Sequence, residues 1–272
     1  MTSAGQVSAP VQILQITDFH LLADAEAAML GINTEASFEA VLERVAEFPF
    51  VPDLFLLTGD LVQDPVPQTY RRLKPFLDAL PAPVYCLPGN HDDPAMMREY
   101  LADGRQIHFQ PHIRLDGWDI ICLNSTLPES PCGHLSEREL SLLETTLQTI
   151  AHDRHVLVSM HHPPMALGSR WLDTMMVGNA AELWARLEQH PNVSGIIIGH
   201  VHQELDEMVN GYRVLASPST CFQFLPRNDD FAIDPVPPGF RWYRLNADGS
   251  IETGVERLSH VPSGLDLASV GY

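Results

Sequence analysis

Pro88-Gly89-Asn90-His91-Asp92 is a short polar turn that directly follows the apolar run Val84-Tyr85-Cys86-Leu87. A short apolar run bounded by turn residues is typical of a buried strand. The turn therefore places an amide and an imidazole side by side at a strand end. Such a pair suits two tasks, because one group can bind a metal ion while the next contacts a substrate.

Four other stretches repeat the pattern of an apolar run followed by side chains that bind metals. They are Asp18-Phe19-His20, Gly59-Asp60, His161-His162 and Gly199-His200-Val201-His202. In the D-x-H and H-x-H stretches both side chains lie on one side of an extended chain, because side chains alternate with a period of two. Parallel strands bring their carboxyl ends to one edge of a sheet, so we expect the five stretches to meet there.

Each of these groups has an ordinary structural interpretation when it is taken alone. Asp60 and Asn90 are common turn residues, and His161 would fit a loop. A metal site is favoured because each group follows its own strand. Asp, His and Asn offer oxygen and nitrogen ligands that suit Mn, Fe, Zn or Co better than a thiolate site would.

The first third of the chain alternates strands with helices. Strands are predicted at Val11–Ile16, Asp53–Leu57 and Val84–Leu87, and helical stripes at 37–48 and 67–80. This βαβαβ order predicts a largely parallel sheet. A further helix is expected at 94–101, and short strands between Ile107 and Asn124.

In the rest of the chain, helices and strands are predicted before His202 and only short strands after it. Before it, Ser136-x-x-Glu139 predicts a capped helix to about Ala151. A second helix at 179–189 has Asn179 and Glu182 in a similar arrangement, and strands are expected at 156–160 and 194–198. After it come short alternating strands at 205–209, 212–216, 222–224, 240–245 and 251–258, with Asn210-Gly211 as a hairpin turn.

These elements favour one domain over residues 1–258, built from two packed sheets with helices outside. Residues 259–272 are polar and contain glycine, so we expect a C-terminal tail. A chain of 272 residues is long enough to bury a sizeable core.

The composition narrows the classes of partner. The formal net charge is −19, from 35 acidic and 16 basic residues, which disfavours binding to nucleic acid or anionic lipid. A small anionic substrate stays compatible with this charge, because bound cations invert the local field.

The cysteines and the N-terminus indicate the compartment. The four cysteines form no C-x-x-C pair, and residues 1–10 lack the features of a secretory signal. No apolar run approaches the ~18–20 residues of a membrane helix. We therefore expect a soluble, cytoplasmic protein with reduced thiols.

The five stretches resemble the calcineurin-like metallophosphoesterases, whose pattern is DxH, GD, GNH(D/E), H and GHxH in that order. The resemblance implies an α/β fold, namely a four-layer α/β/β/α sandwich of two mixed sheets flanked by helices. It implies two metal ions per subunit. Fe and/or Mn are the preferred metals, and Zn, Co or Mg are alternatives. The ligands of one ion would be Asp18, His20, Asp60 and His202, and those of the other Asp60, Asn90, His161 and His200. Asp60 would bridge the ions.

A closer similarity covers most of the chain. Stretches such as Leu135-Ser136-Glu137, Trp171-Leu172-Asp173, Pro218-Ser219-Thr220-Cys221 and Pro238-Gly239-Phe240-Arg241 are similar to bacterial class III cyclic-nucleotide phosphodiesterases. This implies hydrolysis of 3′,5′-cyclic AMP to 5′-AMP by in-line attack of a metal-bridging hydroxide. His91, without a metal, would protonate the leaving O3′ or stabilise the phosphoryl charge. The substrate contacts would be His20, Asp60, Asn90, His91 and His202, and a homodimer is compatible with the family.

Several alternatives stay open. The same site could hydrolyse 2′,3′-cyclic nucleotides or glycerophosphodiesters, and a non-catalytic scaffold of the same fold is the least favoured reading. Phe222 and Phe224 could stack on adenine, although alternating core residues are preferred. Many relatives carry an acidic residue, thought to orient the catalytic His, at the position of Gln63. The partner that orients His91 is therefore open among Gln63, Asp64 and Asp92. His162 is expected beside the metal ligands, and His134 near a helix start.

Overall fold

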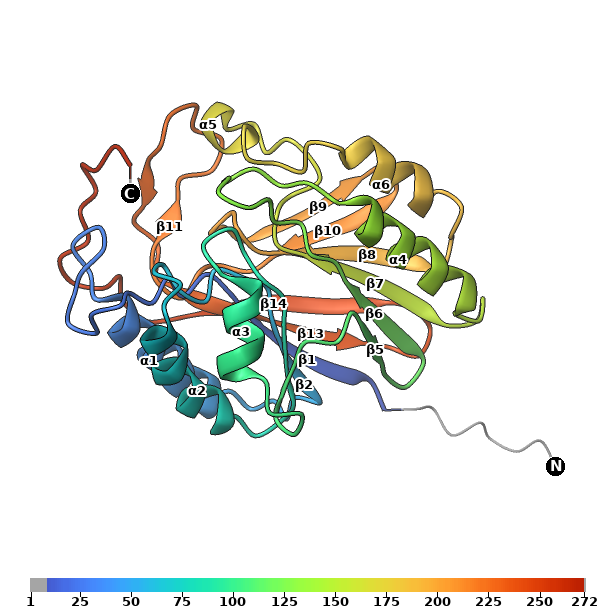
Figure 1. The fold of residues 1–272 in the computed structure, drawn as a ribbon, viewed down its shortest axis with the longest axis horizontal. Helices are drawn as coiled ribbons and strands as arrows, with labels where there is room; N and C mark the ends of the chain where they lie inside the picture. The colour runs from blue at the N-terminus through green and yellow to red at the C-terminus, as the bar shows by residue number, and fades with distance from the viewer. Residues whose placement is uncertain (1–8, 272) are drawn as a thin grey trace.

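Two six-stranded sheets packed face to face form the centre of the molecule, as the computed structural model shows (Figure 1). The structure describes residues 9–271. The expectations for residues 1–8 and for Tyr272, at the two ends of the predicted domain and tail, lie outside the described residues. The predicted α/β class with two mixed sheets is confirmed.

The first sheet has the strand order β14-β13-β1-β2-β3-β4. Strands β1 to β4 are parallel to one another, and β13 pairs antiparallel with both β1 and β14. Their bounds are β1 Val11–Ile16, β2 Leu54–Leu57, β3 Val84–Cys86, β4 Ile107–His108, β13 Gly239–Leu245 and β14 Ile251–Arg257.

The second sheet has the order β5-β6-β7-β8-β10-β9. Strands β6, β7, β8 and β10 are parallel, and the edge strands β5 and β9 are antiparallel to their neighbours. The bounds are β5 His112–Arg114, β6 Trp118–Cys122, β7 His155–Met160, β8 Val193–Ile198, β9 Leu205–Val209 and β10 Tyr212–Ala216. Strands β11 (Gln223–Phe224) and β12 (Ile233–Asp234) form a small separate hairpin.

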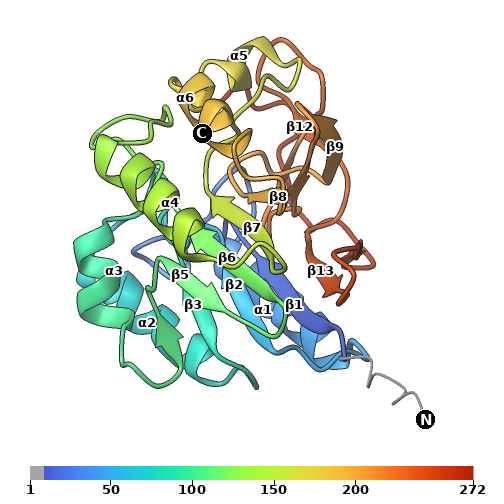
Figure 2. The same cartoon turned by 90° about the vertical axis from the view of Figure 1, so that its right-hand side faces the viewer.

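Helices cover the outer face of each sheet (Figures 1 and 2). Helices α1 (Thr34–Glu47), α2 (Pro67–Asp78) and α3 (Pro94–Leu101) pack on the first sheet, and α4 (Glu137–Thr149) and α6 (Ala180–Leu187) on the second. The short helix α5 (Arg170–Asp173) lies apart from these layers, beside the β11–β12 hairpin. The result is the predicted order of layers, α/β/β/α.

Alternation along β1 and β2 explains why the layers stack. Leu14 and Phe55 belong to the apolar cluster under the helices, whereas Ile13 and Leu56 belong to the cluster between the sheets. Each strand is therefore apolar on both faces, as expected of a sheet buried on both sides. The hairpin at Asn210-Gly211 is also confirmed, because both residues have positive φ angles, of 50° and 87°.

The two predicted helix caps have different outcomes. Ser136 caps α4, since its hydroxyl accepts a hydrogen bond from the Glu139 amide at 3.3 Å. The prediction for Asn179 is wrong, because its side chain makes no capping bond to α6. Instead the side-chain amide of Asn179 hydrogen-bonds to the backbone of Leu135. It accepts from the Leu135 N–H at 3.0 Å and donates to the Leu135 carbonyl at 2.9 Å.

The C-terminal segment 259–271 runs back over the molecule. The Asp266 amide donates to the Leu30 carbonyl at 2.9 Å, and Leu265 packs against the buried cluster around Phe222 and Phe224. In the described part of the chain no helix has the length and apolar character needed to cross a membrane.

Candidate metal centre

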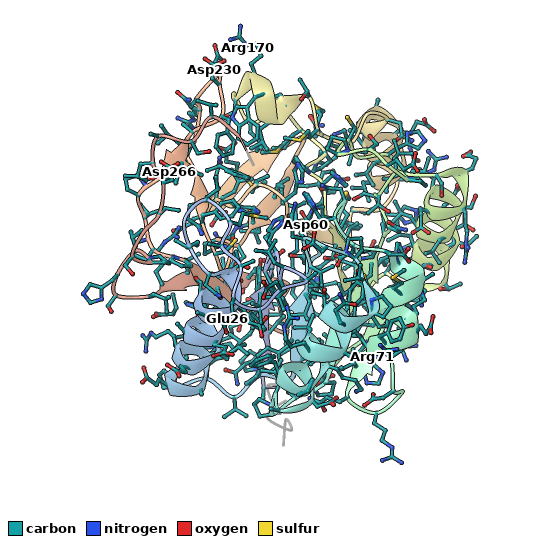
Figure 3. The ribbon with its side chains drawn as sticks, turned by 60° about the vertical axis from the view of Figure 1, so that its left-hand side comes forward. Glu26, Asp60, Arg71, Arg170, Asp230 and Asp266 are labelled. Carbon is teal, nitrogen blue, oxygen red and sulfur yellow. The ribbon has the colours of Figure 1, made fainter. Side chains whose placement is uncertain are left out.

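The seven predicted ligands meet at the carboxyl ends of β1, β2, β3, β7 and β8. Asp60 lies near the centre of the molecule (Figure 3). The side chains of Asp18, His20, His161 and His202 are fully buried, and those of Asp60 and His200 nearly so. Asn90 and His91 are half-buried. The topology therefore brings together residues that are up to 184 positions apart, from Asp18 to His202.

Five of these residues have a backbone conformation that side chains other than glycine disfavour. The φ angles are 56° for Asp18, 49° for His20, 51° for Asp60, 68° for His200 and 46° for His202. Each such residue costs about 1–3 kcal/mol, and residues of this kind cluster at functional sites. Paired loops hold the conformation: the Asp18 amide donates to the Gly59 carbonyl at 3.0 Å, and the His20 amide to the Asp60 carbonyl at 3.0 Å.

Two glycines allow the loops to approach. A Cβ atom on Gly89 would lie 2.1 Å from Oδ1 of Asp60. Gly59 has a φ of 100°, and a Cβ there would lie 2.5 Å from the Gly89 nitrogen. The glycines that precede Asp60 and Asn90 are therefore required by contact between the two loops.

The first cluster consists of Asp18, His20 and His202, with Asp60 alongside. Nδ1 of His20 lies 2.8 Å from Oε1 of Gln63, and Nδ1 of His202 lies 2.9 Å from the Phe222 carbonyl. Because both partners only accept, each Nδ1 carries the proton and each Nε2 is left with a lone pair.

The two Nε2 atoms of this cluster face each other at 3.1 Å. Two lone pairs at this distance repel unless a cation lies between or beside them. Carboxylate oxygens are close, with Asp18 Oδ1 3.5 Å from His202 Nε2 and Asp60 Oδ2 3.7 Å from His20 Nε2. The donor set therefore fits a metal ion.

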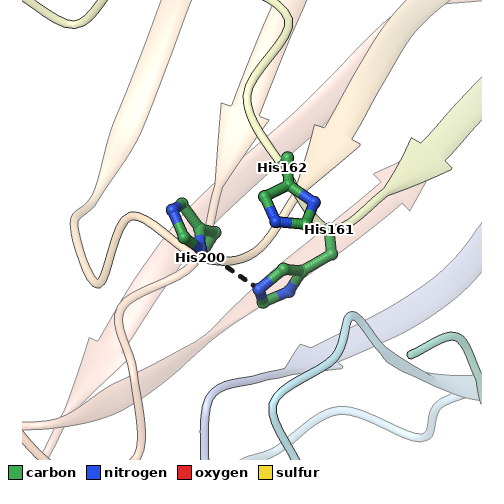
Figure 4. Close-up of side chains that lie close together, drawn as sticks. All are labelled: His161, His162 and His200. Carbon is green, nitrogen blue, oxygen red and sulfur yellow. Dashed lines mark hydrogen bonds between the residues drawn. The ribbon is translucent and has the colours of Figure 1, made fainter. Parts of the chain in front are cut away.

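The second cluster contains Asn90, His161 and His200, and Figure 4 shows its two histidines. Nδ1 of His161 donates to the Thr58 carbonyl at 2.7 Å, so Nε2 is the ring nitrogen that faces the cluster. That Nε2 atom lies 3.2 Å from both Asn90 Oδ1 and Asp60 Oδ2, and 3.3 Å from His200 Nδ1. His200 Nδ1 in turn lies 3.1 Å from Asn90 Oδ1.

The pKa values describe a site arranged for cations. Burial lowers the pKa of His20 to about 3 and that of His200 well below its ordinary value, so both imidazoles are neutral. Burial would raise the pKa of Asp60, but the neighbouring His161 holds it well below its ordinary value. Burial alone would lower the pKa of His161, whereas the Asp60 carboxylate raises it to about 9. Without a metal ion, the buried Asp60 carboxylate thus pairs with a protonated His161 beside the neutral His20 and His200, and a bound cation would replace that proton.

The clusters suit a pair of metal ions. Groups of His and Asp ligand atoms lie within 4.8 Å of one another in Asp18–His20–His202 and in Asp18–Asp60–His161. Asp60 lies between the two clusters, with one contact to each.

His91 lies beside the clusters. Its backbone amide donates to Asp60 Oδ1 at 2.9 Å, and its ring centroid is 5.0 Å from that of His20. The candidates for orienting its ring all have other partners: Gln63 contacts His20, Asp64 accepts from the Ala23 amide at 2.8 Å, and Asp92 accepts from the amides of Leu61 and Gly89. Gln63 thus contacts His20, a proposed metal ligand.

His162 lies closer to the clusters than the sequence suggested. Its ring centroid is 4.8 Å from that of His200, and it forms a group of potential ligands with His161 and His200 (Figure 4). Its Nδ1 lies 2.8 Å from the Ser125 hydroxyl. His134 is exposed, and its amide donates to the Ser125 carbonyl.

Phe222 and Phe224 are core residues. Their exposures are 0% and 1%, so neither ring offers a free face to a base. The ring of Phe224 stacks on the His202 imidazole with centroids 4.3 Å apart. The prediction that both are core residues is confirmed, but the expected alternation is not, because Gln223 between them is also buried and β11 begins only at Gln223.

A family model for calcineurin-like phosphoesterases matches residues 11–204, a range that contains all of the predicted site residues. A dimetal phosphatase from Danio rerio has a similar fold, with a TM-score of 0.56 at 16% identity, over 93% of this chain and 100% of that one. That likeness concerns the fold alone.

Relatives with closer sequences match nearly the whole chain. The 3′,5′-cyclic adenosine monophosphate phosphodiesterase CpdA of Escherichia coli K12 is 42% identical, over 97% of this chain and 96% of its own length. CpdA of Vibrio vulnificus is 40% identical, over 96% and 95%. A 3′,5′-cyclic-nucleotide phosphodiesterase of Nostoc sp. is 38% identical, over 92% and 94%.

Proposed function

The chain belongs to the calcineurin-like phosphoesterase family, and on that premise we propose that it hydrolyses 3′,5′-cyclic AMP to 5′-AMP. The observation that carries this proposal is the near-complete overlap with relatives that are named 3′,5′-cyclic AMP phosphodiesterases. The geometry supports the chemistry, because both clusters of potential ligands lie at one edge of the sheets.

We assign the seven side chains to two metal ions. Asp18, His20, Asp60 and His202 would hold one ion, and Asp60, Asn90, His161 and His200 the other. Two bound ions would lower the pKa of a water molecule and offset the negative charge of a phosphoryl group. Fe and/or Mn are the proposed metals, with Zn, Co or Mg as alternatives, since the donor set fits each of them.

The reaction requires a proton for the leaving group. Hydrolysis joins a water oxygen to phosphorus and breaks the P–O3′ bond, after which O3′ takes up a proton. We propose that His91 either donates that proton or stabilises the charge on the phosphoryl oxygens. Its half-buried ring lies next to His20, and its backbone amide donates to Asp60. Substrate contacts are assigned to His20, Asp60, Asn90, His91 and His202.

A wider nucleotide specificity is the second candidate, favoured by the Nostoc relative that is named a cyclic-nucleotide phosphodiesterase. Specificity constants at equal metal loading separate the two. The panel contains 3′,5′-cyclic AMP, 3′,5′-cyclic GMP, 2′,3′-cyclic AMP and a glycerophosphodiester. The proposal requires the highest value for 3′,5′-cyclic AMP, and a higher value for any other ester contradicts it.

A cytoplasmic location and a homodimer also belong to the proposal. All four cysteines are free thiols, which is compatible with a reducing compartment. Light scattering during gel filtration measures the mass in solution, and a monomeric mass at all concentrations would remove the homodimer from the proposal.

A further inference from the structure

A small cavity opens directly beside the proposed metal centre. Its volume is about 310 Å³, and its lining includes Asn90, His91 and His200. Ligand pockets usually measure about 300–1,000 Å³. The cavity is thus at the small end of that range, large enough for part of a substrate and continuous with the residues that would handle phosphate.

The rest of the lining, the aromatic wall, has a different chemistry. It consists of Pro131, Trp171, Met175 and Phe231, with Gly271 of the C-terminal segment. The lining is therefore polar in one part and apolar and aromatic in another. This division matches a ligand with an anionic phosphate at one end and a flat, largely apolar ring system at the other.

The two aromatic rings of the wall are part of a connected cluster. The Trp171 ring centroid is 5.2 Å from that of Phe231 and 5.0 Å from that of Phe224. Phe224 stacks on His202, a proposed metal ligand. Trp171 and Phe231 are half-buried, in contrast to Phe224. The aromatic surface next to the site thus belongs to Trp171 and Phe231.

Backbone hydrogen bonds fix this wall. The Trp171 amide donates to the Asp229 carbonyl at 3.1 Å, which joins α5 to the β11–β12 loop. The Gly133 amide donates to the Met175 carbonyl at 3.1 Å, which joins the Pro131 loop to the segment after α5. At the rim, Arg170 and Asp230 form an exposed ion pair at 3.6 Å between the same two segments (Figure 3). The wall is therefore tied together before any ligand binds.

We propose that this cavity binds the purine base of the cyclic nucleotide, with Trp171 and Phe231 as its aromatic contacts and Met175 and Pro131 completing the wall. The inference rests on the proposed function, because it places the base of that substrate. Aromatic side chains bind bases through their π faces with little dependence on sequence. The cavity therefore contributes affinity for purine nucleotides over phosphates that lack a base.

The test compares two ligands, the product 5′-AMP and ribose 5-phosphate, which lacks the base. Metal-loaded protein is titrated with 5′-AMP and with ribose 5-phosphate by calorimetry. The wild type is expected to bind 5′-AMP more tightly. Phe231→Leu, which keeps an apolar side chain but loses the flat ring, should weaken 5′-AMP binding by about 5- to 150-fold, or about 1–3 kcal/mol, the range for a lost base stack. Binding of ribose 5-phosphate should not change.

Two matched variants serve as controls. Phe231→Tyr keeps the ring and should retain the wild-type preference for 5′-AMP. Phe50→Leu changes a half-buried phenylalanine that packs on the cluster under the helices, and should alter neither affinity. Phe231→Leu should also raise KM for cyclic AMP while kcat stays within about twofold, because uniform binding energy is lost without loss of transition-state contacts.

The outcomes separate this inference from the proposed function. Equal affinities of the wild type for 5′-AMP and ribose 5-phosphate would overturn the inference without any variant. An unchanged affinity ratio in folded Phe231→Leu would overturn it as well. Wild-type protein that prefers 5′-AMP but does not hydrolyse cyclic AMP would contradict the proposed function and leave the base site supported.

Discussion

Several residues at the metal centre have unfavourable backbone angles, and two of their buried nitrogen atoms lie unfavourably close together. Asp18, His20, Asp60, His200 and His202 all have positive φ angles, and Nε2 of His20 and His202 would repel each other at 3.1 Å without a cation. Both features are explained if the folded protein positions these ligand atoms for metal ions that bind afterwards. The free energy of metal binding then offsets the strain.

The identity of these residues was predictable from the sequence, but their backbone strain was not. Each motif is an apolar run followed by Asp, His or Asn, and this pattern is visible in the sequence. Only Asp60 and His200 follow a glycine, whereas Asp18 follows Thr17 and His20 follows Phe19. Local sequence therefore offers no common signal for the positive φ angles, which arise from hydrogen bonds between loops far apart in the chain.

Replacing His91 by Ala should lower turnover of cyclic AMP by about 10²- to 10⁴-fold, the usual contribution of a general acid. The bound metal should stay at the wild-type amount, because the proposal gives His91 no metal. Asp60→Ala is the opposite case and should lower the metal content itself. Elemental analysis beside steady-state kinetics measures both quantities. Loss of metal in His91→Ala would contradict the assignment.

Gln63 is the residue whose role the sequence left open, and the structure places it against His20. Its carbonyl oxygen fixes the tautomer that leaves Nε2 available. Outer-shell partners of this kind typically contribute 10- to 100-fold in metal affinity. Gln63→Leu should therefore weaken metal binding by about that factor, as measured by competition with a chelator.

The matched control for Gln63→Leu is Gln148→Leu on the exposed side of α4, which should leave metal affinity unchanged. The same affinity in both variants would show that Gln63 does not support His20. A preserved affinity in Gln63→Glu would agree with the assignment, because a carboxylate also accepts the Nδ1 proton.

Among the secondary-structure elements, those with a clear apolar run or stripe were predictable, and two short elements were not. Strands β1, β2, β7 and β8 are apolar runs, and their boundaries lie within one residue of the prediction. Helix α5 and strand β12 were missed, since a single helical turn is too short to show an apolar stripe and β12 contains only one apolar residue. Their positions depend on contacts with distant segments. Helix α5 contributes Trp171 to the proposed base site, and Phe231 lies in the loop that leads into β12. The sequence therefore located the catalytic residues of the pocket but not its aromatic residues.

Helix α4 offers a test of local stability. Ser136→Ala removes the hydroxyl that accepts from the Glu139 amide and should destabilise the protein by about 0.5–2 kcal/mol. Ser141→Ala lies on the exposed side of the same helix and should be neutral or slightly stabilising, since Ala favours helix more than Ser does. Unfolding in urea measures both. Equal effects of the two changes would mean that Ser136 is not a functioning cap.

At the scale of the whole molecule, we propose that residues 1–258 form one domain and 259–272 a C-terminal tail, of which the described part packs on the domain. Residues from both sheets share one apolar cluster, which includes Ile13 and Tyr243 from the first and Ile120 and Leu157 from the second. A core that both sheets share favours unfolding as one unit.

The reactivity of the cysteines tests whether the two sheets unfold together as one domain. Cys86, Cys122 and Cys221 belong to three different apolar clusters. Burial raises the pKa of the Cys122 and Cys221 thiols to about 12 and that of Cys86 well above its ordinary value. Because the thiolate is the reactive form, all three should stay unreactive toward a disulfide reagent in the native protein, even at pH 9. Partly exposed Cys132 should react first.

With increasing urea the three buried thiols should become reactive together, at the same midpoint as the loss of secondary structure. Mass spectrometry after labelling identifies each site. Exposure of Cys86 at a lower urea concentration than Cys122 would indicate that the two sheets unfold separately, and would contradict a single domain.

The central claim is that this chain is a phosphodiesterase that uses two metal ions. It is tested most directly by measuring the specificity constant for 3′,5′-cyclic AMP while metal-free protein is titrated with Mn²⁺ or Fe²⁺ and the bound metal is counted. The account predicts negligible hydrolysis without metal and a rise that reaches its maximum at two bound ions per chain. Full activity at one bound ion, or no hydrolysis of cyclic AMP with two ions bound, would contradict it.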